Sequence, residues 1–167
     1  MKHTIGSVIT GLLLLSALAL HAQTSDFNLQ IEQITIGPKH HAFGYIGQCL
    51  TIPWNQSERY ILGLELDQIT SKPDPGESVG IFVLDTHNNY NQINLDSTTA
   101  WNHQQGTMYY WNPESPETQF FFNAQDPTTK KIYTVLYDVS TMQRVKEYRY
   151  NDTPIANGGI CPTGGVF

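Results

Sequence analysis

The sequence has little charge, few cysteines and, beyond its first residues, no long hydrophobic run. Charged residues make up 14% of the chain, and the formal net charge at pH 7 is -6. Nucleic-acid binding relies on clustered Lys and Arg side chains. The only close basic groups are Lys130–Lys131 and the run from Arg144 to Arg149, where we expect solvated surface. A nucleic-acid partner is therefore not predicted.

Motifs for metal ligation and phosphate binding are also missing. There is no His-x-His or Glu-x-x-His metal cluster and no phosphate-binding glycine loop. We therefore predict no metal ligand, no cofactor and no catalytic residue in this chain. Catalysis by these residues alone is not expected.

The first 22 residues have the features of a secretory signal peptide. Lys2 supplies a positive start, Ile5–Leu20 is mostly apolar, and Ala22 before Gln23 fits a cleavage site. The alternative, a membrane anchor, needs about 20 clean apolar residues, and this run is interrupted by Gly and Ser. We predict export to the periplasm or the medium, with no membrane attachment after cleavage.

What the rest of the chain does contain is an internal repeat with a period of roughly fifty residues. Trp54 of the first copy matches Trp111 of the second, and Asp85 matches Asp138. Each copy has four short strand-like runs separated by turns. They are Cys49–Trp54, Tyr60–Leu66, Val79–Leu84 and Gln92–Leu95 in copy one, and Met108–Trp111, Gln119–Phe122, Ile132–Tyr137 and Val145–Tyr150 in copy two.

Four short strands per repeat are typical of one blade of a β-propeller. We predict an all-β fold of four-stranded antiparallel blades, beginning at residue 40 after an entry segment over 23–39. The two complete blades cover about 46–100 and 107–151, and a third, truncated blade covers about 158–167. Two blades cannot close a ring, which predicts self-association through an open blade face. The alternative is a small β-sandwich, which has no reason to repeat one four-strand order.

The strands differ in character as the strands of a blade would. Val79–Leu84 and Ile132–Tyr137 are almost continuously apolar, as expected of strands covered on both faces. By contrast, Arg144–Tyr150 alternates charged and apolar residues, which predicts a half-exposed strand at an outer rim.

The two cysteines, Cys49 and Cys161, lie far apart in the sequence. In an oxidising compartment a disulfide between them would close a long loop and stabilise the fold by about 4 kcal/mol. Each cysteine, however, falls in the first strand of its own copy, and copy two separates them. We therefore favour two buried free thiols, and neither has the spacing of a zinc site.

Three stretches carry a resemblance to a known group of proteins. His41–Tyr45, Ile52–Asp67 and above all Trp101–Trp111 resemble exported bacterial propeller proteins related to the TolB-type and oligogalacturonate-lyase propellers. Such lyases abstract a proton beside the carboxylate of an acidic sugar, with help from a bound divalent metal. Their metal ligands lie in later blades, so the resemblance assigns no ligand here.

Candidate ligand-binding residues cluster around the expected channel ends of the propeller. The link that leads into copy two supplies Trp101, His103, Gln104 and Gln105, and its alternative role is a hydrogen-bonded structural one. Flat aromatic rings suit stacking on sugars, although packing between blades also needs them. The remaining candidates are Trp111, His41 and Tyr45.

Three hypotheses for function follow from these observations. The preferred one is an exported propeller fragment that binds or scaffolds, with an oligosaccharide or a cell-envelope protein as its partner. The second is part of a metal-assisted polyuronide lyase. The third is a small carbohydrate-binding module.

Overall fold

The computed structural model describes residues 28–43, 52–67, 76–103 and 105–149. The chain divides into two compact units, Met1–Glu32 and Gln33–Phe167. In the first unit the described residues are exposed and carry no helix or strand. Several predicted features lie outside the described residues: the signal peptide, the start of the third blade, Tyr45, Cys49, Gln104 and Cys161.

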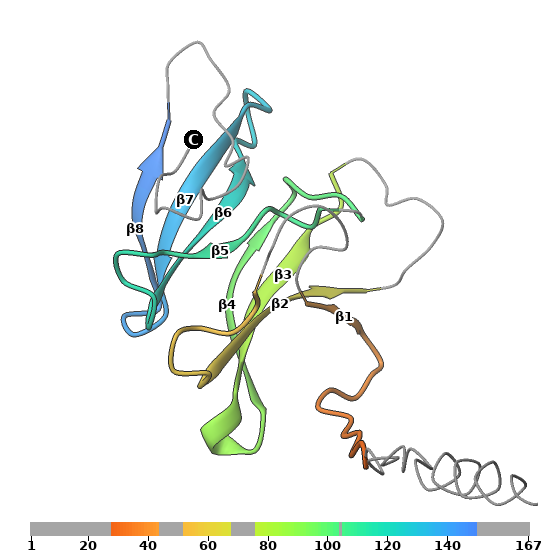
Figure 1. The fold of residues 1–167 in the computed structure, drawn as a ribbon. Coiled ribbons are helices and arrows are strands. Elements are labelled where there is room, and N and C mark those ends of the chain that lie inside the picture. The colour runs from red at the N-terminus through yellow and green to blue at the C-terminus, as the bar shows by residue number, and fades with distance from the viewer. Residues whose placement is uncertain (1–27, 44–51, 68–75, 104, 150–167) are drawn as a thin grey trace, which may run out of the picture. The chain divides into compact units, whose positions relative to one another are not determined.

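In the second unit the described residues form two four-stranded antiparallel sheets and almost no helix (Figure 1). Sheet one contains β1 (His40–Ala42), β2 (Tyr60–Leu66), β3 (Val79–Asp85) and β4 (Asn91–Thr98). Sheet two contains β5 (Tyr110–Trp111), β6 (Gln119–Gln125), β7 (Ile132–Asp138) and β8 (Gln143–Tyr148). In each sheet the spatial order follows the chain order. The predicted all-β class and the two four-stranded antiparallel sheets are confirmed.

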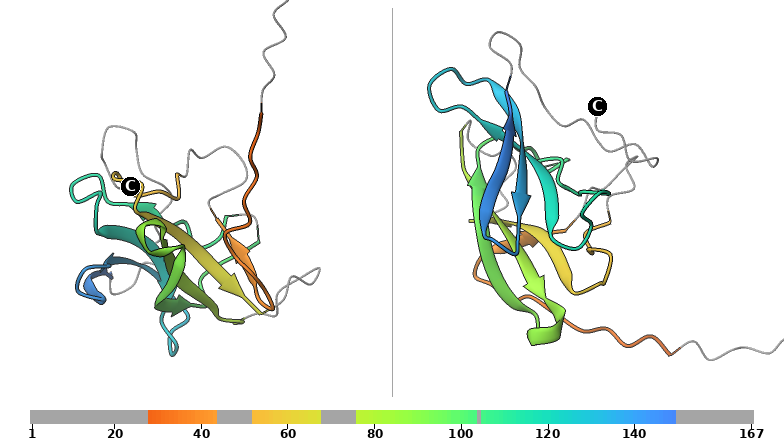
Figure 2. Two further views of the ribbon diagram at one scale, coloured as in Figure 1. Left: turned by 90° about the horizontal axis from the view of Figure 1, so that it is seen from below. Right: turned by 90° about the vertical axis from the view of Figure 1, so that its left-hand side faces the viewer.

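Three predicted strands agree closely with the structure, whereas β4 and β6 end later than predicted, β5 begins later, and β8 begins and ends earlier. β2 has the predicted bounds, and β3 and β7 extend one residue further, to an aspartate in each case. A short 3-10 helix, η1 (Thr86–Asn88), turns the chain from β3 into β4 at the tip of a long hairpin (Figure 2). Asp85 caps this helix, because its carboxylate accepts a hydrogen bond from the His87 amide.

The first strand of sheet one differs from the prediction. The sheet begins with β1 at His40 rather than near residue 46, and β1 pairs with Leu64–Leu66 of β2. Of the run predicted to be the first strand, Trp54 forms only an isolated bridge to Ile61, next to a hydrogen bond from the Leu62 amide to the Pro53 carbonyl. The aromatic contact of His41 with Phe82, at 5.1 Å between ring centroids, helps to hold β1 on the sheet.

Each sheet contributes one face, here called its inner face, to a shared hydrophobic core. Alternate residues of β2 and β3 supply the part from sheet one, and alternate residues of β6 and β7 supply the part from sheet two. The core includes Leu62, Leu64, Val79, Ile81, Val83, Phe120, Phe122, Tyr133, Val135 and Tyr137. Burial of this apolar area is the main term that joins the two sheets.

The opposite, outer face of sheet one is also covered. Ile61, Phe82 and Leu84 form a second buried cluster, against which Ile34, Phe43 and Tyr90 pack. β2 and β3 are therefore apolar on both faces, as their almost continuous apolar sequence predicts. At Gly63 no side chain would fit, because a Cβ atom would lie 2.6 Å from the Cζ atom of Phe82.

The sequence repeat corresponds to a structural repeat at the strand ends. A Trp-Asn pair precedes the second strand of each sheet. The backbone N–H of the asparagine donates to the backbone carbonyl of the first residue of that strand, from Asn55 to Tyr60 and from Asn112 to Gln119. An aspartate ends each third strand, and its carboxylate accepts from the amide two residues later, at His87 and at Ser140. The same local interactions thus begin and end the equivalent strands.

Candidate functional site

The link between β4 and β5, residues 101–106, contains three of the described candidate residues. Trp101 is half-buried and packs against the shared core, and its indole N–H donates to the Glu77 carbonyl at 2.8 Å. His103 is exposed and meets the Trp101 ring edge-on, with 5.1 Å between centroids. The structure therefore brings Trp101 and His103 together.

A tight turn fixes the shape of this link. Asn102 and Gly106 exchange two backbone hydrogen bonds, at 3.1 and 2.9 Å. The Asn102 side-chain oxygen accepts from the Gln105 amide at 2.7 Å, and its nitrogen donates to the Gln105 side chain at 3.3 Å. Gly106 has φ +56°, and a Cβ atom there would lie 2.9 Å from Leu64 Cδ1. Glycine is therefore required by both backbone conformation and space.

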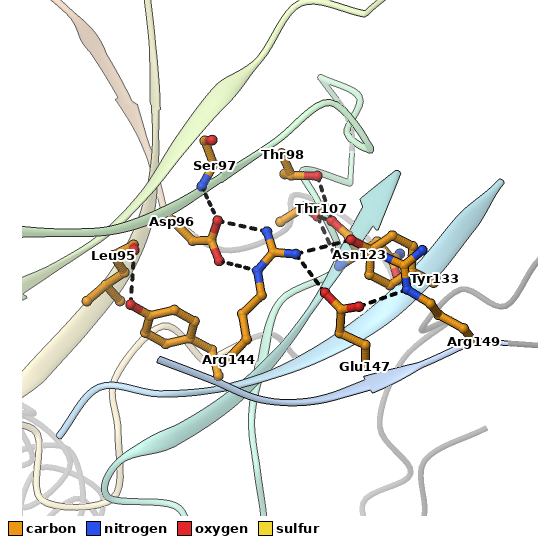
Figure 3. Close-up of polar contacts among 11 residues, drawn as sticks. Leu95, Asp96, Ser97, Thr98, Thr107, Asn123, Tyr133, Arg144, Glu147 and Arg149 are labelled. Atoms are coloured by element: carbon orange, nitrogen blue, oxygen red, sulfur yellow. Dashed lines mark hydrogen bonds and ion pairs between the residues drawn. The ribbon is translucent and has the colours of Figure 1, made fainter. Parts of the chain in front are cut away.

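The residue after the turn anchors the link to sheet two. Thr107 is buried, and its hydroxyl donates to the Asn123 carbonyl at 2.6 Å. The Thr98 hydroxyl donates to the same carbonyl at 2.8 Å (Figure 3). The Asn123 amide in turn donates to the Thr107 carbonyl at 3.0 Å. Thr98 and Thr107, which flank the link, are thus both hydrogen-bonded to Asn123 of β6, and these bonds hold the turn in place.

The polar side chains of the link point to a specific chemistry. Asn102, His103 and Gln105 are exposed. Amide and neutral imidazole groups can both donate and accept hydrogen bonds, which suits hydroxyl groups. Residues 101–106 include no Asp, Glu, Lys or Arg.

Trp111 and His41 are not part of this arrangement. The Trp111 indole donates to the Pro53 carbonyl at 2.8 Å, and its ring contacts Phe120 at 5.9 Å between centroids. It therefore packs one sheet against the other, the structural alternative considered for the aromatic residues. His41 lies on the outer face of sheet one, with its side chain only 8% exposed.

Glu65, which was not among the predicted site residues, organises the polar cluster around His41. Its carboxylate accepts hydrogen bonds from Gln92 at 2.8 Å and Lys39 at 3.0 Å, and lies 3.4 Å from His41 Nε2. The hydrogen bond from Gln92 is the main cause of the lowered pKa of Glu65. Its donors come from two other strands, β1 and β4, and from the residue before β1, so the carboxylate links strands across the sheet. A charged residue within the apolar β2 run was the available signal.

A second polar cluster, here called the arginine clamp, joins the two sheets at β4 and β8 (Figure 3). Arg144 donates two hydrogen bonds to Asp96, at 2.8 and 2.9 Å, and one to Glu147 at 3.0 Å. The Asp96 carboxylate is the main cause of the raised pKa of Arg144. Arg144 lies at the surface, as expected, but its side chain also joins β8 to Asp96 of β4.

Arg149 extends the clamp along sheet two. Its guanidinium lies over the Tyr133 ring, 3.5 Å from the centroid. It also donates to Glu147 at 2.8 Å and to Asp126 at 2.9 Å. The guanidinium groups of the clamp are thus paired with carboxylates of the chain itself, which leaves little attraction for an external anion.

The described residues contain no group of three or more His, Cys, Asp or Glu side chains that could hold a metal ion. Across the same ranges, no helix has the length and hydrophobicity needed to cross a membrane. No protein-family model, curated protein or solved structure matches the chain.

Proposed function

We propose that the two sheets are neighbouring blades of an exported propeller-type protein that binds a neutral oligosaccharide at the 101–106 link. Sheet order supports the blade assignment. Each sheet is completed by consecutive strands before the next sheet begins. Greek-key sandwiches instead pass the chain back and forth between their two sheets.

Burial on both faces supports stacked blades as well. Phe121 and Leu136 lie on the outer face of sheet two and are 4% and 8% exposed, and the outer face of sheet one holds the buried Phe82. In an isolated two-layer sandwich the outer faces carry polar, solvated side chains. Two sheets that are apolar on both sides are what successive blades of a propeller require.

Polar contacts between the sheets fit the same assignment. Tyr137 of β7 donates through its hydroxyl to the Leu95 carbonyl of β4 at 2.9 Å. The Gln56 amide donates to the Pro116 carbonyl at 3.2 Å, which joins the equivalent turns of the two sheets. Contacts between equivalent elements of adjacent repeats are typical of repeat architectures.

The single observation that carries the ligand assignment is the exposed, uncharged polar surface of the 101–106 link. Specific sites combine an apolar base with a few fixed polar groups. Here Trp101 supplies the base, and Asn102, His103 and Gln105 supply the polar groups. The acidic net charge of the chain favours a neutral ligand over an acidic one.

A glycan-binding measurement on the exported chain tests this function. We expect saturable binding of a neutral oligosaccharide from a panel that includes uronic-acid oligomers. His103→Ala and Gln105→Ala should each weaken binding about tenfold, the loss of roughly one hydrogen bond to a hydroxyl. His87→Ala is the matched control, because His87 is exposed on the β3–β4 turn of sheet one. Equal affinities for all three variants would refute the assignment of the link.

A further inference from the structure

Three apolar side chains between residues 28 and 36, those of Leu29, Ile31 and Ile36, are largely exposed, whereas Ile34 packs against the outer face of sheet one. Leu29 is 63%, Ile31 87% and Ile36 83% exposed. The segment of residues 28–36 carries no helix or strand. Three large aliphatic side chains in water along one short stretch are unfavourable, and they mark a surface that another element covers. We propose that this segment is a strand donor, which pairs with the free edge of β8 in a second copy of the chain.

The sequence of the segment has the period of a β-strand. Leu29 and Ile31 alternate with Asn28, Gln30 and Glu32, and Ile34 and Ile36 alternate with Gln33 and Thr35 after one shift of phase. Alternation of apolar and polar residues is the pattern of a strand with one covered face. β-branched residues, abundant here, also favour extended backbone. The segment is therefore suited to pair with a sheet edge, and the structure shows it without a sheet.

β8 offers a suitable edge. Within the described part of the chain it is the last strand of sheet two and pairs with β7 on one side (Figure 1). Val145, on this strand, is 53% exposed, and Met142, just before it, is 46% exposed. Addition of a strand at such an edge supplies backbone hydrogen bonds and covers the apolar side chains next to it.

Charge selects the partner. β8 and the residue after it carry Arg144, Lys146 and Arg149 against one acidic residue, Glu147. Arg144 and Arg149 are paired with carboxylates of the chain itself, so it is Lys146 that disfavours direct pairing of two β8 edges. The donor segment carries Glu32 and no basic residue, so its charge is complementary to that of β8.

Lys146 is the cation best placed to meet the donor. Arg144 and Arg149 are held by carboxylates within the arginine clamp, on the inner face of sheet two. The Lys146 amine instead lies 4.5 Å from the centre of the Tyr148 ring and has no ion pair within the described ranges. Of the other edge strands in the described residues, β1 and β5 are only three and two residues long, and β4 carries no basic residue that could attract an acidic donor.

The oligomeric state of the exported chain tests the pairing, and this test is independent of ligand binding at the 101–106 link. By native mass spectrometry and light scattering we expect a dimer that Ile31→Asp converts to monomer. The control Gln30→Asp adds the same charge beside Ile31 without removing an apolar side chain, and should leave most of the dimer intact. Because Ile31 is exposed, its substitution should not change the melting temperature of the monomer.

A charge exchange distinguishes the β8 edge from other surfaces. Glu32→Lys and Lys146→Glu should each weaken the dimer, and the double variant should recover it. A dimer that none of these variants changes would overturn the proposal, because the interface would lie elsewhere. A monomeric wild-type chain would also overturn it. In that case amide hydrogen exchange over residues 28–36 would show whether the segment pairs within its own chain or with nothing.

Discussion

The two sheets share one backbone plan but stabilise it with different side chains. In sheet one, the aspartate that ends the third strand, Asp85, pairs with Arg59 at 2.9 Å. In sheet two, the equivalent Asp138 accepts from the neutral Gln119 side chain at 3.0 Å and from Ser140. At the end of the third strand, an aspartate is needed to accept the amide hydrogen bond of the following turn. The remaining acceptor capacity of its carboxylate can be used by an ion pair, as in sheet one, or by a neutral hydrogen bond, as in sheet two. The repeat therefore conserves local hydrogen bonding more strictly than it conserves charge.

The sheets also differ in how they fill space. Sheet one places glycines at Gly63 and Gly80 and fills the room with Phe43, Phe82 and Glu65. Sheet two has no glycine in its strands and uses a run of three phenylalanines in β6. Equivalent strands can thus reach similar burial with a glycine beside a large ring or with consecutive large rings.

The largest expected effect is loss of the core that both sheets share. Phe122→Ala removes a fully buried ring from this core and should lower the free energy of unfolding by about 3–5 kcal/mol, measured by urea denaturation. Val145→Ala, on the exposed side of β8, should change stability by less than about 0.5 kcal/mol. A small effect of Phe122→Ala would mean that the two sheets do not depend on a common core.

Alanine substitutions at two glycines compare a crowded position, Gly106, with an open one, Gly76. Gly106→Ala places a methyl group against Leu64 and strains a positive φ, so it should cost about 1–3 kcal/mol. Gly76→Ala also meets a positive φ, of +86°, but finds no atom within 4 Å, so it should cost about 1 kcal/mol. Thermal unfolding of both variants measures the difference. Equal costs would show that Gly106 is required for backbone conformation alone.

A single substitution removes the ion pair of the arginine clamp, which connects the two sheets. Arg144→Met keeps much of the aliphatic stem but leaves Asp96, 15% exposed, without its partner. Because Arg144 itself is 34% exposed, we expect a loss of only about 1–2 kcal/mol. Lys146→Met, on the same strand without an ion pair in the described residues, is the control. The Arg144 effect should shrink at high salt, and a salt-independent effect would indicate lost packing instead.

The smallest of these expected effects is the loss, in acid, of the interactions of the Asp126 carboxylate. The amides of Thr129 and Thr128, together with Arg149, lower the pKa of Asp126 to about 2. The folded state then binds its proton less readily than the unfolded state does. The stabilisation is complete above the ordinary pKa of the carboxyl and is lost as pH falls toward about 2. Asp126→Asn should flatten the stability-against-pH curve in that window, and an unchanged curve would contradict this role.

The hydrophobic pattern of the sequence predicted most of the strands, because strand formation here depends on which residues are buried on each face of a sheet. β2, β3 and β7 are long, apolar runs, and their position follows from burial on both faces. β1 was not predicted because its three residues, two of them histidines, are too few to show a hydrophobic alternation. They form a strand because they pair with β2 and because His41 contacts Phe82. Helix η1 is a single turn capped by Asp85 and matches the predicted turn at this place.

The candidate site was predictable in part for the same reason. Trp101 and His103 are close in sequence, so a turn was enough to bring them together. The partners of Arg144 and Glu65 lie in other strands, and their choice depends on register and on how the sheets pack. Sequence alone places a charged residue on a strand, but it does not say which carboxylate or amide faces it.

The measurement that tests the account most directly is an experimental structure of the protein isolated from its own host. The account predicts that sheet one and sheet two superpose as successive four-stranded units about a common axis, with the 101–106 link facing that axis. A closed two-layer sandwich, in which the outer faces of both sheets contact solvent, would contradict it.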